Sequence, residues 1–259
     1  MNIDFHSPEN RYTYASRAAH PDWAAAIRSV LDPVDIQVAD VGCGGGIYSA
    51  AWLDIGAASV VGVDFSEEMV RAATERNGGP PNISFRQGDA TATGLPSESR
   101  DIVFERALIH HLTDYTACFE EAHRLLRPGG HYVIQDRTPE DITIAGSPDH
   151  IRGYFFECFP KLLDTELGRR PTTPSVEHAL RAAGFVPTQT TTVWETRTTY
   201  AGIEELSQDL LGRVGRSILH YLTDSELAEL VVFIAQRLPA HEPIVERDRW
   251  TIWCADKSH

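Results

Sequence analysis

The sequence has few basic residues, few cysteines and no long apolar run, and each shortage excludes a class of protein. Its 259 residues include 23 lysines and arginines against 37 aspartates and glutamates, a net charge of −14. Such an acidic chain repels nucleic-acid backbones and anionic membrane surfaces, so neither is an expected partner. No apolar stretch approaches the roughly 18 residues of a membrane helix. Four cysteines without a CxxC spacing, and no signal-peptide pattern, predict a cytoplasmic protein with reduced thiols.

A glycine-rich turn is the most informative feature of the sequence. In VADVGCGGGIYSAAWLDIG, residues 38–56, a strand-like apolar run ends in Gly42, Gly44 and Gly46, and a helical pattern follows. Glycine lets a ligand lie against the main chain, and the amide groups of a strand-to-helix turn point into the site. The turn therefore predicts a site for an adenosine-type cofactor. The alternative is a tight turn with a purely structural role.

Acidic residues follow the strands on either side of this turn. Asp40 precedes the glycines, Asp64 ends the strand VVGVDF, and Asp89 ends the strand in FRQGDA. A carboxylate at the position of Asp64 can accept the ribose hydroxyls of a nucleoside, and one at the position of Asp89 can accept the adenine amino group. Each alone would also suit a loop end or a helix cap. The G-x-G-x-G spacing argues against a dinucleotide, and no GxxxxGK[ST] phosphate loop occurs.

Strand and helix patterns alternate through residues 22–136. The strands are short apolar runs without alternation, as in a parallel sheet covered on both faces. Residues 139–175 break the pattern with irregular chain around one amphipathic helix, at the place of a substrate lid. A helix, a Thr-rich strand, two further helices and a last strand follow. We expect one domain over residues 1–259, with cap helices over 1–37 and a lid over 139–175.

Five stretches occur in the order and spacing of one enzyme family. They are VADVGCGGG, VVGVDFSEEM, FRQGDA, DIVFERALIHHL and LLRPGG. Over residues 38–136 the chain resembles the class I S-adenosylmethionine-dependent methyltransferases, in their small-molecule subgroup. The resemblance implies an α/β, doubly wound, mostly parallel seven-stranded sheet of the Rossmann-like methyltransferase fold, with an inserted lid. It also implies S-adenosyl-L-methionine as the cofactor.

The same resemblance assigns roles to residues of the cofactor site. Backbone groups of the glycine turn would hold the methionine part, Asp64 the ribose and Asp89 the adenine edge. Arg17 would pair with the cofactor carboxylate, unless it is a surface arginine. Met69 would pack on the adenine ring, unless it belongs to the core. The complete cofactor set is Tyr14, Arg17, Asp40, Gly42, Cys43, Gly44, Asp64, Phe65, Met69, Asp89, Ala90, Glu105 and Arg106.

Candidate catalytic residues follow the fourth and fifth strands. Methyl transfer is an in-line displacement, and a base is needed only if the acceptor must lose a proton. His110 and His111 follow one strand and Asp136 ends the next, so their side chains face one crevice. Similar histidine pairs in natural-product and sugar O-methyltransferases of the family support His111 as the base and Asp136 as its partner. The alternative is a histidine that packs on the cofactor loop.

The predicted function is methyl transfer from S-adenosylmethionine to a small molecule, with oxygen favoured as the acceptor atom. The alternatives are a C- or N-methyltransferase without a general base, a catalytically silent S-adenosylmethionine-binding protein, and a nicotinamide-dependent oxidoreductase, which the glycine spacing opposes. We expect no metal site, because the sequence has no HExxH motif and no spaced Cys/His set. Apolar residues on the C-terminal helices would allow a homodimer.

Overall fold

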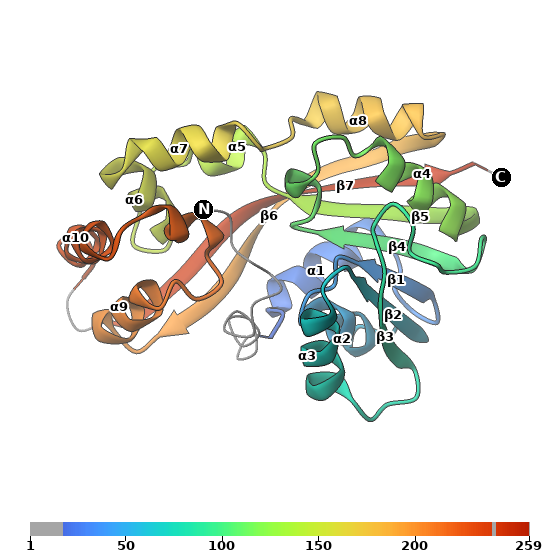
Figure 1. Cartoon of the computed structure of the whole chain (residues 1–259), viewed down its shortest axis with the longest axis horizontal. Helices are drawn as coiled ribbons and strands as arrows, with labels where there is room; N and C mark the ends of the chain where they lie inside the picture. The colour runs from blue at the N-terminus through green and yellow to red at the C-terminus, as the bar shows by residue number, and fades with distance from the viewer. Residues whose placement is uncertain (1–17, 240–241, 259) are drawn as a thin grey trace. The chain divides into compact units, whose positions relative to one another are not determined.

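The computed structural model describes residues 18–239 and 242–258, which fall into two compact units (Figure 1). The core unit comprises residues 18–136, 171–193 and 251–258 of the described chain, and the helical unit comprises residues 137–170, 194–239 and 242–250. The single domain over residues 1–259 expected from the sequence stays a prediction.

One seven-stranded sheet forms the centre of the core unit, with the strand order β3-β2-β1-β4-β5-β7-β6. Strands β1 to β5 pair in parallel, and β7 runs antiparallel to β5. The predicted α/β, mostly parallel sheet is therefore confirmed. The strands are β1 (Gln37–Val41), β2 (Ser59–Asp64), β3 (Ile83–Gln87), β4 (Arg100–Arg106), β5 (Leu126–Asp136), β6 (Phe185–Tyr200) and β7 (Ile244–Lys257).

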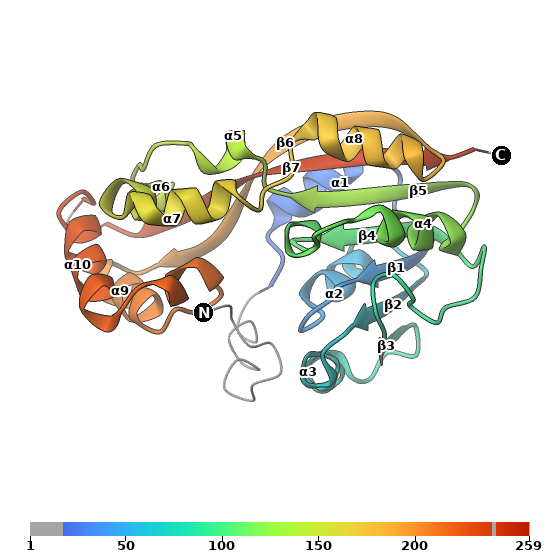
Figure 2. The same ribbon diagram turned by 45° about the horizontal axis from the view of Figure 1, so that its top comes forward.

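Helices cover both faces of this sheet. Trp23 of α1 and Trp52 of α2 pack edge-to-face near Phe104 on one face of β4. On the other face, Phe119 of α4 and Leu180 of α8 join a second apolar cluster, and Figure 2 shows α4 and α1 on opposite sides of the strands. The helices of this unit are α1 (Pro21–Val30), α2 (Ile47–Asp54), α3 (Glu67–Asn77), the 3-10 helix η2 (Ile109–His111), α4 (Thr116–Leu125) and α8 (Thr173–Ala182).

The helical unit has an apolar core of its own, to which Phe155, Leu206 and Leu230 belong. Residues 139–170 of the predicted lid lie in this unit and form three helices where the sequence suggested one. The lid function of residues 139–175 stays a prediction. The helices are α5 (Pro139–Ile142), α6 (Ile151–Cys158), α7 (Pro160–Leu167), α9 (Ile203–Leu211), η3 (Ser217–Tyr221) and α10 (Asp224–Ala235).

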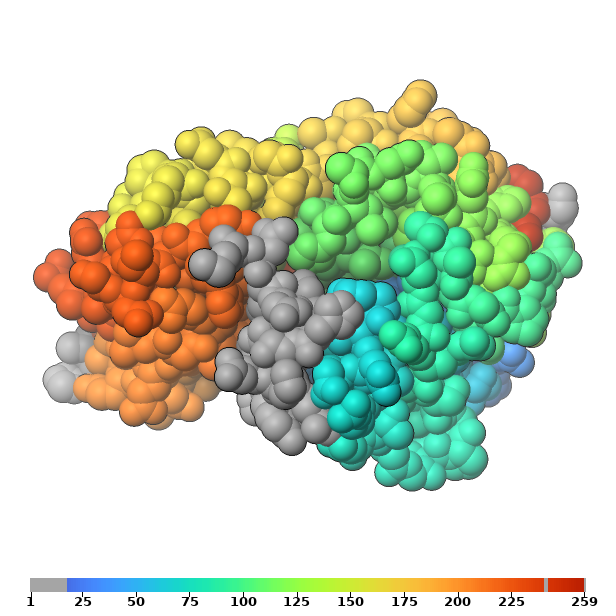
Figure 3. Space-filling view, viewed as in Figure 1, coloured from blue at the N-terminus to red at the C-terminus, as the bar shows by residue number. Residues whose placement is uncertain are grey.

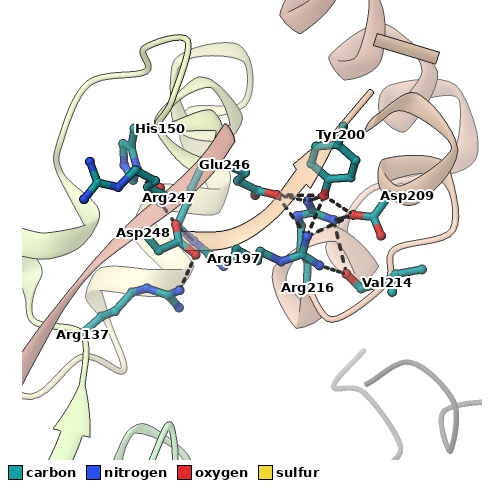
Figure 4. Close-up of polar contacts among 11 residues, drawn as sticks. Arg137, His150, Arg197, Tyr200, Asp209, Val214, Arg216, Glu246, Arg247 and Asp248 are labelled. Atoms are coloured by element: carbon teal, nitrogen blue, oxygen red, sulfur yellow. Dashed lines mark hydrogen bonds and ion pairs between the residues drawn. The ribbon is translucent and has the colours of Figure 1, made fainter. Parts of the chain in front are cut away.

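Buried charges hold the strands of the helical unit together (Figure 4). The side chain of Arg216 is fully buried, and its Nη2 donates to Glu246 at 2.7 Å and to the hydroxyl of Tyr200 at 3.0 Å. Arg197 donates to the same Glu246 oxygen at 3.0 Å, and Asp209 accepts from both arginines. Two cations and two carboxylates therefore compensate one another between β6, β7, α9 and the loop before η3.

A second buried pairing in this unit centres on Asp248 of β7. Its Oδ2 accepts from Arg137 at 2.6 Å, and its Oδ1 accepts from Arg152 of α6 at 3.3 Å.

Among the helices of the described chain, none is long and apolar enough to cross a membrane. Figure 3 gives the space-filling view of the molecule, coloured as in Figure 1.

Candidate active site

The glycine turn between β1 and α2 is bound to the neighbouring strand. The N–H groups of Gly42 and Cys43 donate to the carbonyl oxygen of Val63 at 2.8 and 3.1 Å. Gly42, Gly44 and Gly46 have φ values of +75°, +51° and +73°, a region that side chains disfavour.

Two of these glycines have different surroundings. A Cβ on Gly46 would lie 2.8 Å from the ring of Phe85, whereas a Cβ on Gly44 would have no atom of the described residues within 4 Å. Packing therefore requires a glycine at position 46. At position 44 the half-buried main chain has open space beside its Cα among the described residues, which is what close approach of a ligand needs.

Asp64, at the end of β2, lies against the glycine turn. Its carboxylate is 6% exposed, and Oδ2 accepts from the N–H of Gly44 at 2.8 Å while Oδ1 accepts from the N–H of Ser66 at 2.9 Å. A carboxylate offers about four acceptor positions, so the same group can hold the turn and accept ribose hydroxyls. The place predicted for the ribose therefore has the required acceptor.

A shallow hollow of about 350 Å³ follows in the direction of β3. Phe65, Gln87, Gly88 and Asp89 line it, and Phe65 is 47% exposed. Asp89 accepts from the N–H and the hydroxyl of Thr91 at 2.8 and 2.6 Å, and these hydrogen bonds lower its pKa. The hollow thus has an exposed ring and an ionised carboxylate, as an adenine site would need.

The other two residues predicted for the adenine are less exposed. Met69 of α3 is 3% exposed and is not among the residues that line the hollow, which favours the core alternative for this side chain. Ala90 is half-buried and packs against the apolar cluster of α4 and α8.

Two carboxyl groups at this edge of the sheet are buried. Asp40 accepts a hydrogen bond from the hydroxyl of Ser49, and burial raises the pKa of Asp40 to about 7. Glu105, at the end of β4, accepts from the thiol of Cys118 at 3.1 Å, and burial likewise raises the pKa of Glu105 to about 7. Each therefore changes its charge near neutral pH. Burial also keeps the thiol of Cys43 protonated, because it raises the pKa of that group.

The end of β4 leads into the predicted catalytic histidines. The guanidinium of Arg106 lies over the ring of Tyr48, 4.1 Å from its centroid. Ala107 then has a φ of +53°, and its N–H donates to the carbonyl of Gln135 at 2.9 Å. A non-glycine residue in this conformation is strained, and such strain is often found beside functional sites. Here it turns the chain from β4 into η2. The sequence carried no signal for Tyr48 or Ala107.

His110 of η2 contacts Asp136 at the end of β5. Its Nδ1 lies 2.8 Å from Oδ2 and 3.0 Å from Oδ1 of Asp136, and its backbone N–H donates to Oδ2 at 3.3 Å. Both side chains are buried, at 6% and 0% exposure. A carboxylate beside Nδ1 places the proton on that nitrogen, so Nε2 is the proton-accepting atom of a neutral ring.

The sequence analysis expected His111 to take this place, and the structure gives the contact with Asp136 to His110. Consecutive residues of a 3-10 turn point in different directions. The buried side chain of His110 therefore reaches the end of β5, while that of His111 is exposed. The two imidazole rings nevertheless contact each other in a tilted arrangement, with 4.0 Å between their centroids. Sequence spacing alone did not distinguish two adjacent histidines.

Two predicted cofactor contacts, Tyr14 and Arg17, lie outside the described residues. Within residues 18–239 and 242–258, no group of three or more His, Cys, Asp or Glu side chains is placed to hold a metal ion. The remaining residues fit a nucleoside cofactor: an open glycine main chain, a ribose acceptor and a hollow with an exposed ring.

Comparison with known proteins relates the core unit to an enzyme family. Residues 39–134 match the Methyltransferase domain family. Phosphoethanolamine N-methyltransferase 1 of Arabidopsis thaliana is 36% identical over 110 residues, which are 40% of this chain and 22% of that protein. Ubiquinone biosynthesis O-methyltransferase of Parvibaculum lavamentivorans is 30% identical over 128 residues, 48% of this chain and 49% of that protein. The chain thus spans about a quarter to a half of the relatives it matches.

Solved structures extend the likeness of fold to nearly the whole chain. YcgJ of Bacillus subtilis superimposes with a TM-score of 0.58 at 18% identity, covering 93% of this chain and 99% of that one. Phosphoethanolamine N-methyltransferase 2 of Haemonchus contortus, in complex with phosphomonomethylethanolamine and S-adenosylhomocysteine, gives a TM-score of 0.62 at 17% identity, covering 99% and 61%.

These findings assign a methyltransferase domain to one segment of the chain. Residues 39–134 carry this domain, and the resemblance to class I S-adenosylmethionine-dependent methyltransferases predicted for residues 38–136 is confirmed there. S-Adenosyl-L-methionine is the cofactor of this domain family.

Proposed function

We propose that the protein transfers the methyl group of S-adenosylmethionine to a hydroxyl group of a small-molecule acceptor. The observation that carries this proposal is the buried contact of His110 with Asp136, at the ends of two neighbouring strands beside the glycine turn. A histidine oriented by a carboxylate is suited to remove a proton near neutral pH. A hydroxyl acceptor needs such a base, because it loses its proton as the new bond forms.

The cofactor-binding roles follow from the geometry of the core unit. The main chain at Gly44, with open space beside it, would take the methionine part, Asp64 the ribose hydroxyls, and the hollow beside Phe65 and Asp89 the adenine. When bound, S-adenosylmethionine supplies an electrophilic methyl group on a sulfonium. The protein then aligns the acceptor with that methyl group, which accounts for much of the rate gain in such a displacement.

Asp136 has a positioning role in this mechanism. It holds the proton of His110 on Nδ1 and stabilises the imidazolium that forms when Nε2 accepts the proton of the acceptor. Relatives of this chain include both an N-methyltransferase and an O-methyltransferase by name. The histidine–aspartate contact favours oxygen, because a neutral amine attacks without prior loss of a proton.

The experiment is a methyl-transfer assay with a panel of hydroxylated and amine-bearing small molecules, measured for the natural protein and for His110→Ala. We expect hydroxyl acceptors to be methylated, with loss of turnover in the variant and unchanged binding of S-adenosylmethionine. Methylation of amines alone, with full activity in the variant, would overturn the proposal of O-methylation while leaving the methyltransferase assignment in place.

A further inference from the structure

Asp40 and Glu105 lie on neighbouring strands and on opposite faces of the sheet at its cofactor edge. In the parallel register of β1 and β4, Asp40 is level with Phe104, and Glu105 is level with Val41. The side chain of Asp40 meets Ser49 of α2, and that of Glu105 meets Cys118 of α4. They are 2% and 1% exposed. One buried carboxyl group therefore lies on each face of the sheet, Asp40 near the end of β1 and Glu105 near the end of β4.

Titratable groups from several segments act on Asp40, and Glu105 is one of them. Asp64 of β2 adds negative charge, Arg106 at the end of β4 adds positive charge, and the thiol of Cys43 lies in the turn itself. Ser49 contributes the hydrogen bond. Asp40 is thus buried between one carboxylate and one guanidinium, and its own charge is only partly compensated.

Glu105 has a less polar environment. Cys118 of α4 donates to its Oε1, and the hydroxyl of Tyr132 on β5 lies nearby. Asp136 and Asp40 are the charged groups that act on it, and both are acidic. In the described part of the chain, Oε2 of Glu105 is buried and makes no hydrogen bond. Among the described residues, no cation is one of the main influences on the pKa of Glu105.

With the cofactor bound at the glycine turn as proposed, methyl transfer would change a charge at the sheet edge where these groups lie. S-Adenosylmethionine has a positively charged sulfur, and the product S-adenosylhomocysteine has a neutral thioether with otherwise the same groups. In the reaction the carbon–sulfur bond breaks with its electrons on sulfur, the acceptor oxygen gains the methyl group, and the acceptor proton leaves. A nearby cation favours the ionised form of a buried carboxyl group, and its loss favours the protonated form.

We propose that Asp40 and Glu105 distinguish substrate from product by changing their protonation: ionised beside the sulfonium, protonated beside the thioether. This inference rests on the proposed function, because it takes the cofactor to bind at the glycine turn. The pKa values near 7 support it, since both groups can change charge at neutral pH. Binding of S-adenosylmethionine then releases protons, and a rise in pH favours the substrate over the product, which promotes product release.

Isothermal titration calorimetry in phosphate and in Tris, whose ionisation enthalpies differ, measures the protons exchanged on binding. At about pH 7 we expect S-adenosylmethionine to release roughly half a proton to one proton more than S-adenosylhomocysteine. Sinefungin, which has a charged amine near the sulfur position, should behave like S-adenosylmethionine. Equal proton exchange for all three compounds would overturn this inference. Failure of every compound to bind would overturn the proposed function itself.

Variants assign the effect to the two residues. Asp40→Asn and Glu105→Gln should each reduce the difference in proton release, whereas Asp101→Asn, at the opposite end of β4, should leave it unchanged. His110→Ala should retain a difference in proton release between the two compounds, because both carboxyl groups remain. A difference that disappears with His110→Ala and persists in both carboxyl variants would overturn the assignment. Circular dichroism establishes that each variant is folded.

The natural protein provides a test that needs no variant. Between about pH 6 and pH 8 the ratio of the affinities for S-adenosylmethionine and S-adenosylhomocysteine should rise several-fold, because the two ligands differ in proton release. A ratio that is constant over this range would contradict the inference even if no variant folds.

Discussion

The Nδ1 atom of His110 lies 2.8 Å from Oδ2 of Asp136, and the backbone N–H of His110 donates to the same oxygen at 3.3 Å. The carboxylate therefore holds both the ring and the main chain of this residue. Because Nδ1 carries the proton in this arrangement, Nε2 is the atom that can accept a proton from an acceptor.

Replacement of His110 tests the general base. His110→Ala should lower the turnover number by roughly 10²–10⁴-fold, the usual contribution of a general base, with little change in S-adenosylmethionine affinity. The matched control is His111→Ala, which removes the exposed neighbour and should retain most of the activity. Steady-state kinetics and calorimetry on both variants provide the comparison. A larger loss in the control would place the base at His111.

Replacement of Asp136 tests the positioning role. Asp136→Asn keeps the size of the side chain but removes the charge that stabilises the imidazolium. We expect the turnover number to fall by up to about 10⁴-fold, as when an amide replaces the carboxylate that orients a catalytic histidine. The pH–rate profile distinguishes this role from a structural one, because loss of the carboxylate should move its acid limb. A profile of unchanged shape at reduced activity would indicate that Asp136 only supports the fold.

Two glycines of the same turn should respond differently to alanine. In Gly46→Ala the new Cβ meets the ring of Phe85 at 2.8 Å in a strained conformation, so stability should fall by about 2 kcal/mol or more. In Gly44→Ala the Cβ enters open space, so stability should fall by only about 1 kcal/mol while S-adenosylmethionine binding is lost. Denaturant unfolding and calorimetry measure the two effects. Normal cofactor binding by Gly44→Ala would show that the backbone at Gly44 does not contact the cofactor.

The stability of the protein should decrease as the pH rises from acidic to neutral values. Burial raises the pKa of Glu105 from 4.5 to about 7, so the folded state binds this proton more tightly than the unfolded state. The stabilisation is complete below the unfolded pKa, and it is lost at about 1.4 kcal/mol per pH unit as the pH rises toward 7. Glu105→Gln should flatten this part of the pH–stability curve in denaturant unfolding, and an unchanged slope would contradict the assignment.

Removal of Arg216 should strongly destabilise the helical unit. Arg216→Ala leaves Glu246 and Asp209 buried with one cation fewer, which costs about 3–5 kcal/mol for a broken buried pair. Lys161→Ala is the control, because its ion pair with Glu226 is exposed and should contribute at most about 1 kcal/mol. Equal melting temperatures for the two variants would show that the buried network does not stabilise this unit.

The sequence was sufficient to predict the core of the fold. Apolar runs such as VADV and VVGV are buried strands because both faces of the sheet are covered, and the glycines after β1 mark a turn that only glycine permits. Asp64 and Asp89 also lie where their places after strands predicted. Parallel strands bring their carboxyl ends to one edge, so the sequence order of these residues carries spatial information.

The buried charged residues of the helical unit could not be predicted from the sequence in the same way. The first half of β7 has the sequence IVERDRW, whose alternating charges are typical of an exposed segment, yet Glu246 and Asp248 are buried. Their partners lie far away in the sequence, at Arg216 and Arg137, and no local pattern reveals such pairs. The same limit applies to Glu105 and Cys118.

Calorimetric titration with S-adenosylmethionine and S-adenosylhomocysteine, with NADH as the control, tests the cofactor site most directly. We expect low-micromolar binding of both sulfur compounds and no binding of NADH, and Asp64→Asn should weaken the binding by at least about tenfold. If neither sulfur compound binds, the glycine turn is not a cofactor site, and the roles proposed for the surrounding residues are wrong with it.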